Sequence, residues 1–339
     1  MAICKKTSVK KGTEEVHIFT LTNDQGMVVE VMNYGCTLME IKVPDRNGKM
    51  ENILLHYDRA EDYFKDSYYL NCIVGRYANR IANGSCSIGG KEYQLSVNEA
   101  ALRNHLHGGF SGFNKKVWEI ADDGSISGKL VFSCLSPHLE EGYPGNLRVE
   151  VSFYLGNDNA LEIAYSAETD QPTIVNLTHH SYFNLSGGSG DIFNHDMKVN
   201  ASFYTPADER YIPSGDLAPV AGTPYDLRET RKVETLAHSI ATLNYCLDDH
   251  IRFPEAAQLS DPTSGRRMRL HTTEPGMQLY FGNFLGGEFA PFSALCMEPQ
   301  HYPDSPNHPL FPSTILLPGE EYFQSTVYRF DTLPVHSAK

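Results

Sequence analysis

Apolar and polar residues alternate along much of the chain, which is the pattern of half-buried β-strands. In LRVEVSFYL, residues 147–155, every second residue is apolar and those between are polar. The alternation resumes in ALEIAYSAET, 160–169, after the turn sequence GNDN, so the two segments predict an antiparallel hairpin. Gly89-Gly90 in CSIGGKEYQL and Asn47-Gly48 in VPDRNGKMENILL predict two further hairpins.

Helical periodicity is scarce. Short helices are predicted only at RAEDYFKDS, 59–67, with Asp58 as a possible N-cap, and at ETLAHSIATL, 234–243. No linker, charge block or repeat marks a domain boundary. The sequence therefore predicts an all-β protein: one large antiparallel β-sandwich forming a single domain over residues 1–339.

Charge and composition narrow the classes of partner. The chain of 339 residues has 28 Lys and Arg against 42 Asp and Glu, a net charge of -14, so its field repels nucleic acid. The lysines of MAICKKTSVKKG precede no apolar stretch, and no window approaches the roughly 18 apolar residues of a membrane span. Seven cysteines without a C-x-x-C pair suit a reducing compartment. We therefore expect a cytoplasmic protein with no membrane or nucleic-acid partner, as a monomer or homodimer.

Candidate chemistry collects in five polar segments, which place His, Arg, Asp or Glu beside Gly or an aromatic residue. A sugar requires many hydrogen-bonding partners for its hydroxyls and an aromatic surface against its apolar face. Asp249 and Glu298 could form a glycosidase pair, whereas a His and a Glu could act as acid and base on one sugar ring. The five segments are GRYANRIANG (75–84), RNHLHGG (103–109), THHSYFNL (178–185), LDDHIRF (247–253) and CMEPQHYPD (296–304).

A metal centre and several common enzyme classes find little support. His105 and His107 are two residues apart and His179 and His180 are adjacent, but no H-E-x-x-H or Cys/His set completes a coordination shell. The chain has no G-x-S-x-G, Walker A or G-x-G-x-x-G motif. We expect neither a metal nor an organic cofactor.

Six motifs, taken together and in order, resemble the aldose 1-epimerases, or galactose mutarotases. The resemblance extends from VMNYGCTLMEIKVPDRNGK to STVYRF and implies a galactose-mutarotase-like β-sandwich that interconverts the α and β anomers of free aldoses such as galactose and glucose. The motifs are GRYANRIANG, LHGG, NLTHHSYFNLSG, DDH, PGMQLYFGNFL and CMEPQHYPDSPNHPLFPS followed by LLPGEEY.

The resemblance also implies roles for individual residues. His180 takes the position of the family's general acid and Glu298 that of its general base. Tyr182 is expected to line the same pocket. The chain departs from the family's usual Asn at His179 and usual Thr at Pro299. The sugar-binding positions fall on Asn79, Arg80, His107, Asp249 and Gln278.

The residue types fit ring opening, which removes a proton from the C1 hydroxyl and delivers one to the ring oxygen. With ordinary pKa values of about 6.5 for His and 4.3 for Glu, His180 would donate and Glu298 would accept near neutral pH. Alternation along 174–185 places His180 on a polar face and His179 on an apolar one.

Three rival functions remain open, and one of them is the glycosidase that Asp249 and Glu298 could form. A hexose-6-phosphate 1-epimerase would need cations near the phosphate, which the arginines of SGRRMRL, 264–270, could supply if the fold brought them close. A non-catalytic sugar-binding β-sandwich would not need the pair formed by His180 and Glu298.

Overall fold

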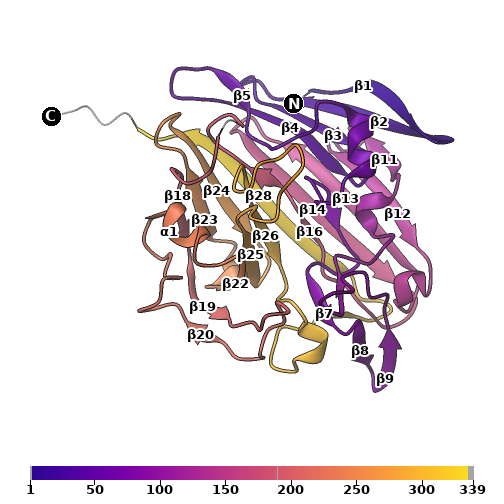
Figure 1. Cartoon of the computed structure of the whole chain (residues 1–339). Coiled ribbons are helices and arrows are strands. Elements are labelled where there is room, and N and C mark those ends of the chain that lie inside the picture. The colour runs from indigo at the N-terminus through magenta and orange to yellow at the C-terminus, as the bar shows by residue number, and fades with distance from the viewer. Residues whose placement is uncertain (1, 189, 335–339) are drawn as a thin grey trace.

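Three antiparallel sheets form the body of the protein. The computed structural model describes residues 2–188 and 190–334 (Figure 1). The first sheet, along the upper edge of Figure 1, has the order β1 (Ala2–Lys11), β2 (Glu14–Thr22), β3 (Val28–Met32), β4 (Thr37–Pro44) and β5 (Met50–Asn52).

A nine-stranded sheet is the largest element, and the C-terminal strand runs through its middle (yellow in Figure 1). Its order is β11 (Glu119–Asp123), β12 (Leu130–Ser136), β13 (Leu147–Leu155), β14 (Ala160–Thr169), β28 (Tyr322–Thr332), β24 (Arg266–Thr272), β23 (Glu255–Ser260), β18 (Asp196–Val199) and β21 (Arg231–Lys232). The predicted hairpins pair as β13 with β14, β8 (Ser85–Ile88) with β9 (Lys91–Gln94) and β4 with β5, which confirms all three.

A six-stranded sheet packs against the nine-stranded one. Its order is β17 (Tyr182–Phe183), β26 (Leu295–Gln300), β25 (Gly276–Tyr280), β22 (Thr242–Leu247), β19 (Ala201–Thr205) and β20 (Ala218–Pro219). The remaining strands pair two by two: β7 (Arg80–Ala82) with β10 (Asn104–Leu106), β6 (Ile73–Val74) with β16 (Thr178–His179), β8 (Ser85–Ile88) with β9 (Lys91–Gln94), and β15 (Thr173–Ile174) with β27 (Ile315–Leu316).

Apolar and polar residues alternate along the strands of the six-stranded sheet, so one face is apolar and packs in the core while the other face is polar. Leu243 of β22, Leu279 of β25 and Met297 of β26 lie in the same apolar core as Val151 and Tyr328 of the nine-stranded sheet. Because neighbouring residues point to opposite faces, the residues between them form the other face of the sheet. The sequence pattern therefore builds the predicted sandwich and leaves one polar face for a site.

Helices are few and short, as predicted, but two details differ. Residues 234–243 form a helix only at α1 (Glu234–Ala237), because β22 begins at Thr242 and pairs with β25. The predicted helix at 59–67 is the 3-10 helix η1 (Ala60–Lys65), and its N-cap position is Arg59 rather than Asp58. The other 3-10 helices are η2 (Phe113–Lys115), η3 (Glu140–Gly142), η4 (His250–Arg252) and η5 (Ser305–Asn307). Among the residues described, no helix is both long and apolar enough to cross a membrane.

Candidate active site

A cavity of about 220 Å³, called here the central cavity, opens on the polar face of the six-stranded sheet. It brings together six of the residues predicted from the sequence, which come from strands and loops far apart along the chain. These are Asn79, Arg80, His107, His180, Tyr182 and Glu298.

His180 and Glu298 meet inside this cavity. His180 lies between β16 and β17, where its backbone N–H donates to the Cys72 carbonyl and its own carbonyl accepts from the Asn71 N–H. Glu298 lies on β26, and its Oε2 is 3.7 Å from Nε2 of His180. Both side chains are buried, and within the described residues Glu298 Oε2 accepts no hydrogen bond. A sugar hydroxyl is a suitable partner for such an acceptor.

Burial changes the charge states that ordinary pKa values predict for this pair. It lowers the pKa of His180 to about 3. It raises the pKa of Glu298 to about 8, although the charge of Arg80 opposes the rise. At neutral pH the pair thus holds one proton, which rests on Glu298 rather than on His180. The expectation of a partly protonated His180 and an ionised Glu298 is wrong for this environment because it ignored desolvation.

His107 is oriented by Asn79. The backbone N–H of Asn79 donates to Nδ1 of His107 at 3.1 Å, and the His107 N–H donates to the Asn79 carbonyl. Both residues have positive φ angles, at 52° and 61°, in the loops flanking β10 and β7. Since burial lowers the pKa of His107, the ring is neutral, and its proton lies on Nε2 because Nδ1 accepts. His107 is therefore a hydrogen-bond donor at Nε2.

The same tautomer bears on metal binding. One ligand atom each from His107, His180 and Glu298 could be chosen within 4.8 Å of one another. To bind a metal, Nε2 of His107 would first have to lose its proton to Nδ1. Nδ1 could then no longer accept the hydrogen bond from the Asn79 N–H. The three side chains are therefore better arranged to hydrogen-bond a polar molecule than to coordinate an ion.

Arg80 is fixed by a carboxylate beside the cavity. Its Nε and Nη2 donate to the two oxygens of Glu99 at 2.9 and 2.7 Å, and its guanidinium lies 4.7 Å from the centre of the Tyr211 ring. A bidentate pair of this kind holds the guanidinium plane in one orientation. Arg80 can thus offer a positioned donor to a bound hydroxyl.

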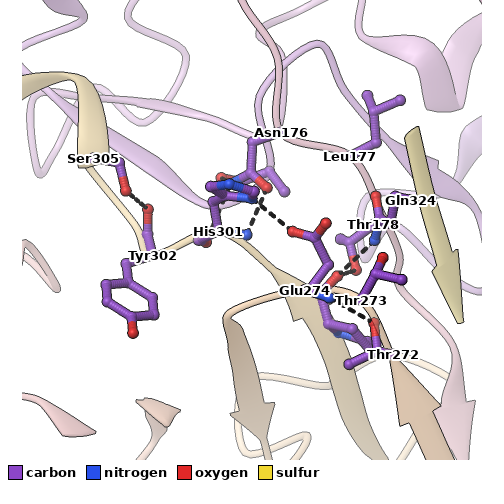
Figure 2. Close-up of polar contacts among 12 residues, drawn as sticks. Asn176, Leu177, Thr178, Thr272, Thr273, Glu274, His301, Tyr302, Ser305 and Gln324 are labelled. Carbon is purple, nitrogen blue, oxygen red and sulfur yellow. Dashed lines mark hydrogen bonds and ion pairs between the residues drawn. The ribbon is translucent and has the colours of Figure 1, made fainter. Parts of the chain in front are cut away.

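A hydrogen-bond network around His301 connects the strand of Glu298 to neighbouring segments. Figure 2 shows His301, just after β26, paired with the buried Glu274 at 2.7 Å. Burial alone would lower the pKa of His301, but the Glu274 carboxylate outweighs burial and raises it. Asn176 accepts from the His301 N–H and donates to its carbonyl, while Thr178 donates to the Pro299 carbonyl. The segment leading to His180 is therefore bound to the strand that carries Glu298.

Two predicted residues lie outside the central cavity. Gln278 lines a smaller adjoining cavity with Asn79, Arg80 and Thr242. Asp249 does not line either cavity; its side chain is 53% exposed and pairs with Arg252. It follows the far end of β22, whose five residue steps from Thr242 span about 17 Å. The structure therefore does not bring Asp249 to the site, and Thr242 lies there instead.

Several lining residues were not anticipated. Tyr69 packs its ring 4.6 Å from that of His107 and 6.1 Å from that of His180. Tyr280 and Phe284 stack on each other and add aromatic surface. Tyr68 and Tyr69 in SYYLN are adjacent aromatic residues and are visible as a signal in the sequence. Thr242 lies in a segment predicted to be a helix and gives no such signal. The residues missed are Ser67, Tyr68, Tyr69, Glu99, Leu106, Thr242, Tyr280 and Phe284.

The arginines of 264–270 do not reach the central cavity. Arg266 is buried against Glu51, and Arg267 and Arg269 both pair with Asp331 on β28. Among the residues that line the central cavity, Arg80 is the sole Lys or Arg, and it is already paired. This charge pattern disfavours a phosphorylated sugar.

Fold and site together define a β-sandwich protein with a buried acid and base pair, polar donors and aromatic walls. The model of the family described as aldose 1-epimerase matches residues 17–329. The chain belongs to the aldose 1-epimerase family.

Similar proteins cover nearly the whole chain. It is 41% identical over 334 residues to the galactose mutarotase of Mus musculus, covering 94% of this chain and 95% of that protein. It is 36% identical over 335 residues to the aldose 1-epimerase of Escherichia coli, covering 92% and 94%. A solved galactose 1-epimerase from Lactobacillus acidophilus superposes with a TM-score of 0.85 at 29% identity, covering 98% of both chains. The predicted fold and family are thereby confirmed.

Proposed function

We propose that this protein is an aldose 1-epimerase that interconverts the α and β anomers of free aldohexoses such as galactose and glucose. The observation that carries the proposal is the buried pair of His180 and Glu298, 3.7 Å apart in a cavity of about 220 Å³. Family membership supports the same reaction. We further propose that the chain forms a single domain and that the protein acts in the cytoplasm as a monomer or homodimer. It would require neither a metal nor an organic cofactor.

The pair can perform both proton transfers. Glu298 removes the proton from the C1 hydroxyl while His180 donates one to the ring oxygen, and the bond between C1 and the ring oxygen breaks. The resulting aldehyde rotates about C1–C2, and closure on its other face reverses both transfers. The pair begins and ends with one proton, so no external donor is consumed. At neutral pH the shared proton rests on Glu298. The reactive arrangement, with this proton on His180, forms by one proton transfer between the two side chains.

The remaining residues hold the substrate in place. Arg80 and Nε2 of His107 supply donors to ring hydroxyls, and such donors also stabilise charge that develops on oxygen during opening. Tyr182, Tyr280 and Phe284 provide aromatic surface for the apolar face of the ring. Asp249 has no role in this mechanism, because it lines neither cavity.

Polarimetry tests the proposal. We expect freshly dissolved α-D-galactose or α-D-glucose to reach anomeric equilibrium faster with the protein than in buffer, without nucleotide and after treatment with a chelator. Methyl α-D-galactoside should stay intact, because its blocked C1 oxygen has no proton to lose. Rates equal to buffer for every common aldose would contradict the proposal, and cleavage of the methyl galactoside would indicate a glycosidase instead.

The pH dependence follows from the single shared proton. Below about pH 8 Glu298 retains the proton, and above it the pair is fully deprotonated and lacks an acid. We expect kcat/KM to be nearly constant from pH 5 to 7 and to fall about tenfold per unit well above pH 8. Initial rates, corrected for the spontaneous reaction, measure this profile. An acid limb near pH 4.5 together with an alkaline limb near pH 6.5, about the ordinary pKa values of Glu and His, would show that burial does not perturb the pair.

A further inference from the structure

A second, much smaller cavity of about 20 Å³, called here the side cavity, adjoins the central cavity. The two share Asn79, Arg80 and Thr242 in their walls. A space of about 10–15 Å³ on this measure holds one water molecule. The side cavity therefore has room for a single oxygen-sized group.

Three residues in register lead from this cavity to Glu298. Asn244 on β22 is opposite Gln278 on β25, and Gln278 is opposite Glu298 on β26. All three lie on the polar face of the six-stranded sheet, because their neighbours along each strand point into the core. A group bound at Asn244 and Gln278 is thus on the same surface as the acid and base pair.

Hydrogen bonds identify which end of each amide already has a partner. Thr242 Oγ1 donates its hydrogen to the Leu279 carbonyl at 2.9 Å, so it must accept from Nε2 of Gln278 at 2.5 Å. Nδ2 of Asn244 donates to Thr205 Oγ1 at 3.3 Å. Within the described residues each amide nitrogen therefore has a hydrogen-bond partner, whereas the amide oxygens have none.

Both free oxygens are buried acceptors. Asn244 is 3% and Gln278 is 4% exposed, and within the described residues neither Asn244 Oδ1 nor Gln278 Oε1 has a hydrogen-bond partner. An unpaired buried acceptor is costly, so a group that supplies a hydrogen is strongly favoured at this position. The donors of Arg80 and His107 in the central cavity complement this pair of acceptors.

We propose that the side cavity is a subsite for one O–H group, with Asn244 and Gln278 as its acceptors. The group is either a hydroxyl of the sugar or a water molecule that the sugar contacts, and both present the same chemistry. The proposal rests on the proposed function and adds Asn244, whose amide oxygen would select sugars by the hydroxyl that they carry.

Deoxy sugars test the subsite. With the wild-type protein, one of the 2-, 3-, 4- and 6-deoxy analogues of galactose should lose about ten- to a hundredfold in kcat/KM. Asn244→Leu, which keeps a similar volume without an acceptor, should lower kcat/KM for galactose by a similar factor and no longer discriminate against that analogue. This coupling identifies a sugar hydroxyl in the side cavity. A bound water would instead make Asn244→Leu slow all sugars equally.

Controls separate the subsite from folding and from the reaction itself. Asn244→Asp retains an acceptor and should keep the discrimination, and Asn23→Leu, at a buried asparagine bonded to Gly156 and Asn159, should affect stability alone. If Asn244→Leu does not fold, Asn244→Ala replaces it in the same comparison. A folded variant with unchanged kcat/KM for every sugar would overturn the subsite. A wild-type protein without mutarotation would refute the proposed function, and calorimetric titration with the same sugars would then test the subsite.

Discussion

Glu298→Gln should reduce turnover by about a hundred- to ten-thousandfold while leaving the fold intact. The substitution keeps the size of the side chain but removes the group that accepts the proton, and Glu298 is 2% exposed at 3.7 Å from His180. Polarimetric turnover on α-D-galactose and circular dichroism measure the two effects. Glu150→Gln, on the solvent side of β13, should retain full activity as the matched control. Near-normal turnover in folded Glu298→Gln would remove Glu298 from the mechanism.

The same variant should gain relative stability as the pH rises. The pKa of Glu298 is raised to about 8 in the folded protein, whereas the unfolded chain releases this proton near its ordinary pKa. Between these values the unfolded state binds fewer protons, so the contribution of Glu298 to the free energy of unfolding falls by about 1.4 kcal/mol per pH unit. That contribution is complete below the unfolded pKa and is lost as the pH passes 8.

Unfolding of both proteins at pH 5.5 and 8.5 therefore distinguishes a buried proton acceptor from an ordinary carboxylate. The glutamine cannot titrate, so wild type should lose stability relative to Glu298→Gln between the two pH values. Parallel changes in the two proteins would show that desolvation does not perturb Glu298. A simultaneous loss of turnover and gain of alkaline stability would indicate that stability is sacrificed for the reaction at this residue.

Much of the fold could be predicted because local patterns and tertiary structure agree. Alternation in 147–155 and 160–169 and the glycine-containing turns specify hairpins that require no long-range information. The limits of β22 could not be predicted in this way. Thr242 becomes a strand residue through pairing with Tyr280, which lies 38 positions later, and this pairing leaves no local signal.

The lining of the central cavity was predictable where a sequence motif contains the residue itself, as for Arg80, His107, His180 and Glu298. Charge states were not predictable, since the pKa shifts of His180 and Glu298 arise from burial by residues distant in sequence. Asp249 illustrates the opposite error. Asp249 has a suitable side chain and lies in a suitable motif, but it follows the end of β22 that is far from the central cavity. Only the register of the sheet shows this position.

The adjacent histidines lie on opposite sides of their segment, as alternation predicted, although the expected regular strand over 174–185 is interrupted into β15, β16 and β17. His180 lines the central cavity. His179 is 1% exposed; its Nδ1 is 2.7 Å from the Ser181 hydroxyl, its Nε2 is 3.1 Å from the Cys36 carbonyl and its ring lies against Phe153. One ring is therefore available to a substrate and the other is part of the core.

His180→Asn and His179→Asn should accordingly separate catalysis from stability. His180→Asn removes the acid and should lower turnover by about a hundred- to ten-thousandfold with little change in melting temperature. His179→Asn leaves the central cavity intact, so turnover should stay within a few-fold. Its shorter side chain cannot bridge Ser181 and Cys36 in the same way, and leaving a buried group unpaired costs about 1–3 kcal/mol of stability. Mutarotation rates and thermal unfolding of both variants measure these effects. Equal losses of turnover would show that the two histidines act together, and a larger loss at His179 would reverse their roles.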